Sequence, residues 1–166
     1  MRNTPTSPTG RRLLSRTAEH ALRAALYLGR QEAAGLVSAA EVARALGTPP
    51  NYTAKTLRQL TRKGLLRSVR GPHGGFALRA SGSELSIAHI VDAVDEPADE
   101  PAVCLLGDRP CEAAHPCGAH RRWLEVQAHT IELLERTTLA DLLNGDGALD
   151  APALATTTLA TRVEIS

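Results

Sequence analysis

The sequence predicts a mainly α-helical fold with a small β-wing, arranged as a winged helix-turn-helix followed by a long helix. Three observations support this. The chain of 166 residues has only four aromatic residues, so its core consists of Ala, Leu and Val, of which Ala and Leu favour helices. Residues 38–66 show two short helices joined by a glycine turn, and residues 65–78 a glycine-rich hairpin. Residues 121–144 form a long amphipathic stretch.

The N-terminal region divides into a polar arm and a helix. Residues 1–12 are polar and contain Pro and Gly, which predicts a disordered arm. From Ser15 onward, small and aliphatic residues recur at steps of three and four positions, and this spacing predicts a helix that ends near Ala34–Gly35.

Residues 38–66 carry the signals of a helix-turn-helix. Ser38 and Glu41 have the spacing of a capping box, and Gly47 supplies the left-handed conformation of a tight turn. Thr48 is expected to cap the second helix, with a proline in its first turn. The outward face of this second helix carries hydrogen-bonding and cationic side chains that favour DNA contact: Asn51, Thr53, Lys55, Arg58, Arg62 and Lys63.

The hairpin after this helix completes a winged helix, which we assign to a DNA-binding domain over residues 13–82. Strands are expected at 66–69 and 76–78, around a tip that contains Arg70 and His73. Arg70 at the edge of the wing is suited to a narrow minor groove, where negative potential is concentrated. The glycines of the tip are equally explained by loop geometry alone.

The charge of the chain is divided sharply between its two halves. Residues 1–80 contain 14 Lys and Arg against 3 Asp and Glu, whereas residues 81–166 contain 5 against 15. This division indicates that only the first half meets a polyanion. The alternative is that two solvated faces of opposite sign attract each other.

The acidic half is expected to hold a metal-binding loop and dimerisation helices over residues 83–144. Residues 86–95 predict a short helix, residues 121–144 predict a long helix, and a final short helix begins at Thr138. The apolar stripe of the long helix is expected to pack against a second subunit, because the N-terminal domain has a core of its own. Residues 145–166 lack a period and predict a flexible tail.

All three cysteines, Cys104, Cys111 and Cys117, fall in one short segment. The chain has no apolar run near the roughly 20 residues that span a membrane, and no signal peptide, so we expect a cytoplasmic protein with reduced thiols. Gaps of six and five residues fit a structural zinc site poorly and suit an iron–sulfur cluster better. Zinc and ligand-free cysteines remain as alternatives.

These motifs, in this order, resemble the bacterial winged-helix regulators that include the iron–sulfur cluster regulator (IscR) and the nitric-oxide-sensitive repressor (NsrR). The resemblance spans about residues 13–144 and is carried by AEHALRAALYL, SAAEVARALG, NYTAKTLRQLTRKGLL, SVRGPHGGFAL, IAHIVDAVDEP, the cysteine segment and TLADLLN. It implies a homodimer that binds a pseudo-palindromic operator in double-stranded DNA and has no membrane attachment. It also implies that an iron–sulfur cluster controls DNA affinity.

The resemblance further implies which residues hold the cluster. Cys104, Cys111 and Cys117 match the three thiolate ligands, although the first gap is one residue longer than is familiar. One branch of the family takes its fourth ligand from a histidine that matches His120, which favours a 2Fe–2S cluster. The other branch takes it from an acidic residue of the partner subunit that matches Glu19, and this keeps a 4Fe–4S cluster possible.

We therefore expect a transcriptional repressor, not an enzyme, that senses nitric oxide, redox state or iron–sulfur status through its cluster. An iron–sulfur electron-transfer or cluster-carrier protein would also need thiolates and an acidic surface, but it has no use for a cationic helix and a wing. A further alternative is a regulator of the same fold that senses a metabolite or thiol oxidation without a metal.

Overall fold

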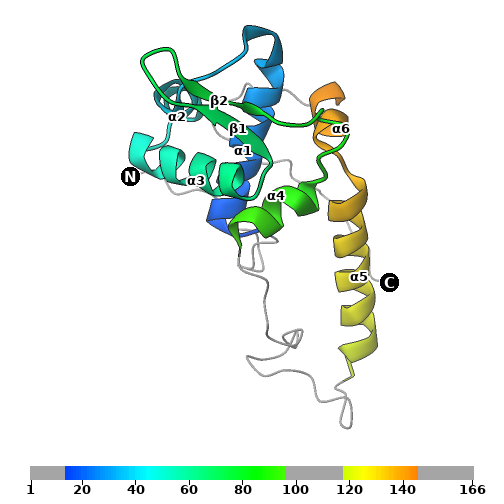
Figure 1. Cartoon of the computed structure of the whole chain (residues 1–166). Helices are drawn as coiled ribbons and strands as arrows, with labels where there is room; N and C mark the ends of the chain where they lie inside the picture. The colour runs from blue at the N-terminus through cyan, green and yellow to red at the C-terminus, as the bar shows by residue number, and fades with distance from the viewer. Residues whose placement is uncertain (1–13, 96–117, 146–166) are drawn as a thin grey trace, which may run out of the picture.

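The computed structural model describes residues 14–95 and 118–145 of the chain. The predicted N-terminal arm, the three cysteines and almost all of the predicted tail lie outside these residues. Within the described part, the elements are mostly helices with one two-stranded sheet, as Figure 1 shows. The prediction of a mainly α fold with a small wing is therefore confirmed.

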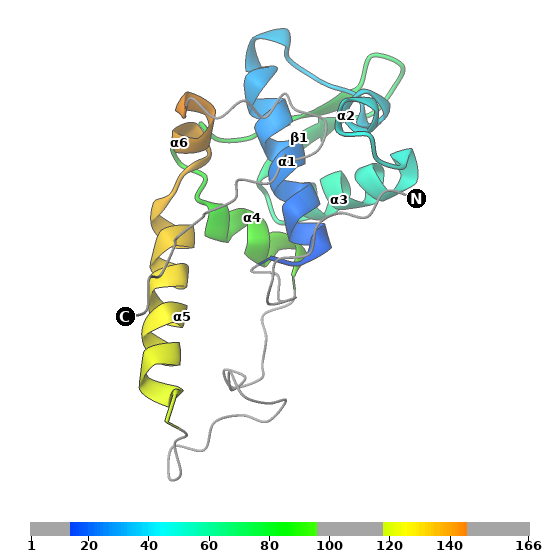
Figure 2. The same ribbon diagram turned by 180° about the vertical axis from the view of Figure 1, so that it is seen from behind.

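Helix α1 (Arg16–Arg30) lies at the centre of the molecule, with α3, α4 and α6 packed around it (Figures 1 and 2). The hydroxyl of Ser15 caps its start by accepting a hydrogen bond from the amide of Ala18 at 2.9 Å. Apart from His20, its buried side is made of alanine and leucine, and the small alanines allow neighbouring helices to approach closely. A single 3₁₀ turn, η1 (Glu32–Ala34), covers the rest of the predicted helix before Gly35, where φ is 84°.

Helix α2 (Ala39–Leu46) has the ends that the sequence predicts. The amide of Glu41 donates to the Ser38 hydroxyl at 3.2 Å, and Gly47 ends the helix in the left-handed conformation, with φ 63° and ψ 36°. The chain therefore turns within a few residues, and it presents the next helix across α1.

Helix α3 (Pro50–Arg62) begins one residue later than predicted. Pro49 occupies the cap position and Pro50 the first helical position, where its missing amide needs no partner. The expectation that Thr48 caps this helix is wrong. Its hydroxyl instead lies 2.8 Å from the hydroxyl of Thr53, a contact that ties the turn to the first helical turn.

The wing is an antiparallel pair, β1 (Leu66–Val69) and β2 (Gly75–Leu78), in register from Leu66 opposite Leu78 to Val69 opposite Gly75. The backbone of Val37 extends this pairing through two hydrogen bonds with Phe76, of 2.9 and 2.8 Å. A Cβ at position 75 would lie 2.6 Å from the carbonyl oxygen of Val37, so glycine is required there. The wing is thereby fixed to the body.

The second half of the chain returns to the same body. Helix α4 (Ile87–Val94) packs on α1, and α5 (His120–Arg136) extends away from the body before α6 (Leu139–Asn144) packs against α1 (Figures 1 and 2). Backbone hydrogen bonds fix the α5–α6 junction, from Ile87 to Thr137 at 2.9 Å and from Leu139 to Leu85 at 2.7 Å.

One hydrophobic core joins all of these elements except α5. Leu57 and Leu60 of α3, Ile90 of α4 and Leu139 of α6 are each at most 1% exposed and belong to the same cluster as α1. Helices α4 and α6, which lie within the range 83–144 predicted to hold the metal-binding loop and dimerisation helices, thus share the core of the winged helix. No helix in the described ranges is both long and apolar enough to cross a membrane.

Candidate nucleic-acid interface and metal ligands

Helix α3 has one buried face and one exposed face. Thr56, Leu57 and Leu60 are at most 1% exposed and hold the helix on α1. The opposite face carries most of the predicted DNA-contacting residues, and all of these are exposed: Asn51, Lys55, Arg58, Arg62 and Lys63. No salt bridge joins any of these cations to a carboxylate of residues 14–95 or 118–145.

Thr53 is not part of this exposed face, so its predicted outward position is wrong. Its side chain is 0% exposed, and its hydroxyl lies 3.3 Å from the carbonyl oxygen of Pro49, to which it donates a hydrogen bond. Threonine hydroxyls form such bonds to the carbonyl four residues earlier inside helices. Thr56 bonds Tyr52 in the same manner at 3.2 Å, so neither hydroxyl is available to a ligand.

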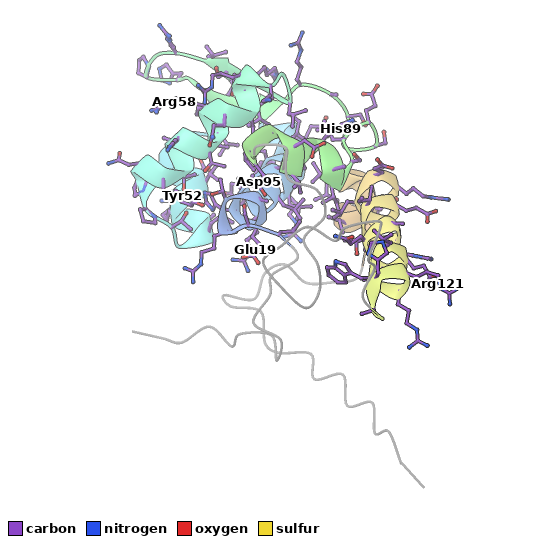
Figure 3. All side chains as sticks on the ribbon, turned by 90° about the horizontal axis from the view of Figure 1, so that it is seen from below. Glu19, Tyr52, Arg58, His89, Asp95 and Arg121 are labelled. Carbon is purple, nitrogen blue, oxygen red and sulfur yellow. The ribbon has the colours of Figure 1, made fainter. Side chains whose placement is uncertain are left out.

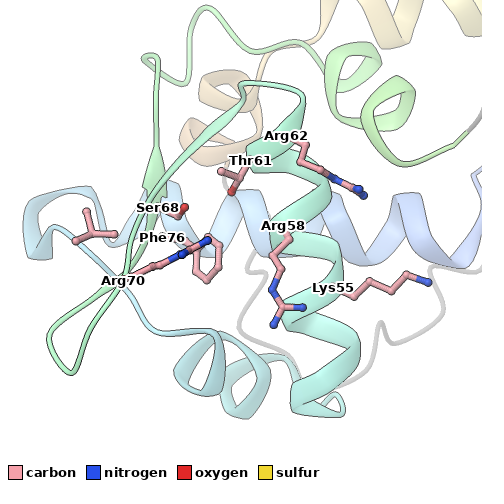
Figure 4. Close-up of a pocket in the computed structure, with 8 residues that line it drawn as sticks. Lys55, Arg58, Thr61, Arg62, Ser68, Arg70 and Phe76 are labelled. Carbon is pink, nitrogen blue, oxygen red and sulfur yellow. The ribbon is translucent and has the colours of Figure 1, made fainter.

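A groove of about 550 Å³ separates α3 from the wing. Figure 4 shows Lys55, Arg58 and Arg62 along one side of α3, while Arg70 extends from the wing towards that helix. Phe76 and Val69 supply an apolar floor, and Val69 is 51% exposed. Four cations on two separate elements thus border one open groove, an arrangement that suits a phosphate backbone.

The geometry of the wing tip depends on its glycines. Gly71 has a φ of 116°, a conformation that residues with side chains rarely adopt. A Cβ at Gly74 would collide with the carbonyl oxygen of Val69. The tip can therefore close tightly, and it leaves Arg70 and His73 exposed at the edge of the wing.

The structure places two of the five predicted metal ligands, because the three cysteines lie outside the described residues. Glu19 is half-buried in the first turn of α1, and His120 is the first residue of α5. Figure 3 labels Glu19 on the body and Arg121, which follows His120 in the sequence, on α5. Among the described residues, no three His, Cys, Asp or Glu side chains form a metal site.

The donor atoms of His120 nevertheless fit a ligand role. Its Nδ1 atom is buried and has no hydrogen-bond partner in the described part of the chain. A buried ring nitrogen without a partner is uncommon in proteins, since its desolvation is not offset. An imidazole in this state is able to ligate iron without first breaking another bond.

Sequence reasoning did not identify His20 as a buried residue of α1. It is 5% exposed, and its ring lies 4.6 Å from that of Tyr52 in α3, centroid to centroid. Burial, and to a lesser extent the nearby Arg23 cation, lower the pKa of His20, so the ring is favoured in its neutral form. Its spacing of four and eight residues from Ala24 and Leu28 places it on the buried stripe, and that signal was available in the sequence.

Helix α5 leaves several large apolar side chains exposed to solvent. None of its residues is buried, although α4 packs beside it. Its large exposed apolar residues are between 44% and 60% exposed: Leu124, Val126, Ile131 and Leu133. At 100° per residue these four positions bound an arc of about half the helix. The charged residues occupy the opposite arc.

The chain is similar in sequence to transcriptional regulators that are named for a helix-turn-helix, the motif formed here by α2 and α3. The sequence profile of the family described as "Rrf2: Iron-dependent Transcriptional regulator" matches residues 14–145. The chain is 31% identical over 134 residues to an Aquifex aeolicus protein named as an HTH-type transcriptional regulator, covering 80% of this chain and 92% of that one. It is 29% identical over 137 residues to the regulator IscR of Escherichia coli, covering 82% and 83% of the two chains.

Solved structures show the same fold. CymR, the global cysteine regulator of B. subtilis, has a TM-score of 0.66 at 23% identity, with 80% of this chain and 97% of that chain covered. IscR of T. potens has a TM-score of 0.64 at 23% identity, with 82% and 89% covered. The family profile spans the winged helix, α5 and α6 together, and this chain therefore belongs to the Rrf2 family of transcriptional regulators.

Proposed function

We propose that this protein is a homodimeric repressor of transcription whose affinity for a pseudo-palindromic operator is set by an iron–sulfur cluster. The observation that carries the proposal is the groove between α3 and the wing, which is bordered by Lys55, Arg58, Arg62 and Arg70. Other residues of the chain would contact DNA, pair with a second subunit and hold the cluster.

In the proposed complex, α3 enters the major groove and the wing follows the adjacent minor groove. The first turn of α3 is rigid, because Thr53 and Thr56 bond the preceding turn and Leu57 is fully buried. Asn51 is therefore presented to base edges from a fixed position. Lys55, Arg58 and Arg62 pair with phosphates, while Arg70 enters the minor groove from the wing.

Dimerisation is proposed through α5. The apolar arc bounded by Leu124 and Leu133 is wider than α4 covers, and exposed apolar surfaces of this extent are characteristic of interfaces. A two-fold pairing of these helices would present two copies of α3 to half-sites about 34 Å apart. Such spacing makes operator affinity sensitive to small changes near α5.

The ligands of the cluster are proposed to be Cys104, Cys111 and Cys117. His120 is the favoured fourth ligand, since its Nδ1 atom is buried and has no hydrogen-bond partner among the described residues. This favours a 2Fe–2S cluster, whereas ligation by Glu19 of a second subunit would suit 4Fe–4S. When bound, the cluster would supply an iron centre that reacts with nitric oxide or changes redox state. The chain itself would supply the thiolates and, from the half-buried His120, an imidazole.

A second candidate is a regulator that senses thiol oxidation without a metal. The likeness to CymR, named as the global cysteine regulator, supports this alternative, because the same fold there serves a regulator named for cysteine. Membership of a family of transcriptional regulators, together with the cationic groove, favours either regulator over an electron-transfer or cluster-carrier protein.

Spectroscopy of the protein isolated without oxygen tests the proposed ligands. We expect visible absorption and bound iron in the wild type, and loss of both in Cys104→Ser, Cys111→Ser and Cys117→Ser. His120→Ala should shift the absorption bands while Glu19→Gln should not. Colourless, iron-free wild-type protein whose DNA binding responds to a thiol oxidant would instead establish the metal-free regulator.

A further inference from the structure

A hydrogen bond joins the start of α1 to the end of α4, where the chain enters the stretch that contains the cysteines. The hydroxyl of Ser15 donates to Oδ1 of Asp95 at 2.6 Å, across a separation of 80 residues. Asp95 is the C-terminal cap residue of α4 and the last described residue before the stretch that contains the three cysteines. The same hydroxyl accepts a hydrogen bond from Ala18, so one atom both caps α1 and bonds the chain leading to the cysteines.

A second contact joins the same end of α1 to α3, the helix proposed to enter the major groove. The rings of His20 and Tyr52 lie 4.6 Å apart at an interplanar angle of 31°, and His20 is buried at 5% exposure. The Tyr52 hydroxyl also lies 3.4 Å from the carbonyl oxygen of Arg16, a long hydrogen bond to the first residue of α1. Two contacts therefore fix the first turn of α3 to the first two turns of α1.

Both contacts are made by residues at the N-terminal end of α1. Ser15 and His20 are five residues apart on α1, or about 7.5 Å along the helix axis. Figure 3 shows Asp95, Glu19 and Tyr52 on the same side of the body, around the start of α1. A displacement of Asp95 would therefore reach Tyr52 through one turn and a half of helix, without any change in the core.

Tyr52 lies among the residues proposed to touch DNA. Asn51 precedes it, and Lys55 follows one turn later on the exposed face of α3. The Nε2 atom of His20 has no hydrogen-bond partner among the described residues, so its position depends on ring packing rather than on a polar anchor. The ring contact is thus the means by which α1 orients this turn.

We propose that Ser15 and His20 are positioning residues through which Asp95, at the start of the cysteine-containing stretch, sets the orientation of the first turn of α3. This inference rests on the proposed function, because it assigns a path within one subunit between the cysteines and the DNA interface. This effect within one subunit would act together with any change in the distance between the two α3 helices of the dimer. The arrangement with the Ser15–Asp95 bond intact is the one that binds the operator.

Hydrogen exchange of the full-length protein tests the path without requiring a cluster. Asp95→Ala is expected to speed exchange of the amides of residues 51–57 and to leave the wing strands unchanged. Ser15→Asp should do the same, because aspartate retains the helix cap but repels Asp95. Ser15→Thr, which keeps a hydroxyl, is the matched control and should exchange like the wild type. Unchanged exchange of residues 51–57 in Asp95→Ala would overturn the inference.

Operator affinity provides the second measurement. Asp95→Ala and His20→Ala should each weaken binding by about threefold to tenfold, as expected from loss of one exposed hydrogen bond or one ring contact. The salt dependence should not change, because no phosphate contact is lost. His20→Phe should restore affinity by keeping the ring. The double variant should bind no more weakly than either single variant, since both substitutions interrupt one path.

The two possible failures are distinguishable. Fully additive losses in the double variant, or a His20→Phe variant as weak as His20→Ala, would show that the residues act independently and would overturn the inference. Equal operator affinity of wild-type protein with and without iron would overturn the proposed function instead. The exchange measurement would still decide whether Asp95 orients α3.

Discussion

The salt dependence of DNA binding should report how many cations of α3 meet phosphates. Lys55, Arg58 and Arg62 are exposed along one side of α3 and border the same groove. A dimer would bring six such cations to the duplex. Each phosphate contact contributes about −0.9 to the slope of log K against log salt, so these contacts predict a slope of roughly −5.

Arg58→Ala is the sharpest perturbation of this set, because Arg58 lies between the other two cations. Each dimer would lose two phosphate contacts, and the slope should become less steep by about 1.8. Its affinity should fall equally for operator and scrambled duplexes, since a phosphate contact carries no sequence information. Fluorescence anisotropy between 50 and 200 mM salt, roughly the range over which such effects are large, measures both quantities.

Arg136→Ala provides a control that removes the same charge elsewhere. Arg136 lies on the charged arc of α5, its side chain is 78% exposed, and it pairs only weakly with Glu132 at 3.2 Å. Its loss should leave the slope unchanged. If Arg58→Ala keeps the wild-type slope, or if Arg136→Ala changes it as much, then the groove beside α3 does not hold the phosphate backbone.

Three further outcomes follow from individual contacts. Arg70→Ala should weaken operator binding by about 1–3 kcal/mol and reduce sequence preference in competition assays, and unchanged affinity would remove the wing from the interface. Leu139→Ala should lower the unfolding free energy in urea by about 2–5 kcal/mol, because this fully buried side chain fixes α6 on α1, whereas a loss under 1 kcal/mol would contradict that packing. Hydrogen bonds from Thr138 lower the pKa of Asp141, so their stabilisation is present above pH 3.8 and is lost as pH falls through the lowered pKa. Asp141→Asn should therefore be less stable than wild type at pH 7 and equal to it in strong acid, and a difference that persists there would refute this sign.

Local signals predicted most of the fold. Ser38 and Gly47 marked the ends of α2 because capping and left-handed turns depend on the residue type itself. The exposed cations of α3 followed from helical spacing in the same way. Thr53 was wrongly predicted to face outward. Its hydroxyl bonds the helix backbone, and the residue type alone does not show whether a threonine hydroxyl bonds the backbone or points to solvent.

Contacts between distant residues were not predictable from such signals. Three such contacts are the pairing of Val37 with Phe76, the bond from Ser15 to Asp95 and the packing of α6 on α1. In each case neither segment has a local sequence pattern that identifies the segment it contacts. His20 lies between these cases, because its helical spacing indicates burial but not the ring that it meets.

The ratio of operator affinities with and without bound iron tests the central claim most directly. Wild-type protein would be prepared without oxygen, divided, and one portion freed of iron with a chelator before anisotropy titration of the same duplex. We expect the two portions to differ in affinity by at least about tenfold, and Cys111→Ser to match the iron-free portion. Equal affinity of the two portions, with intact helical content in both, would contradict control of DNA binding by an iron–sulfur cluster.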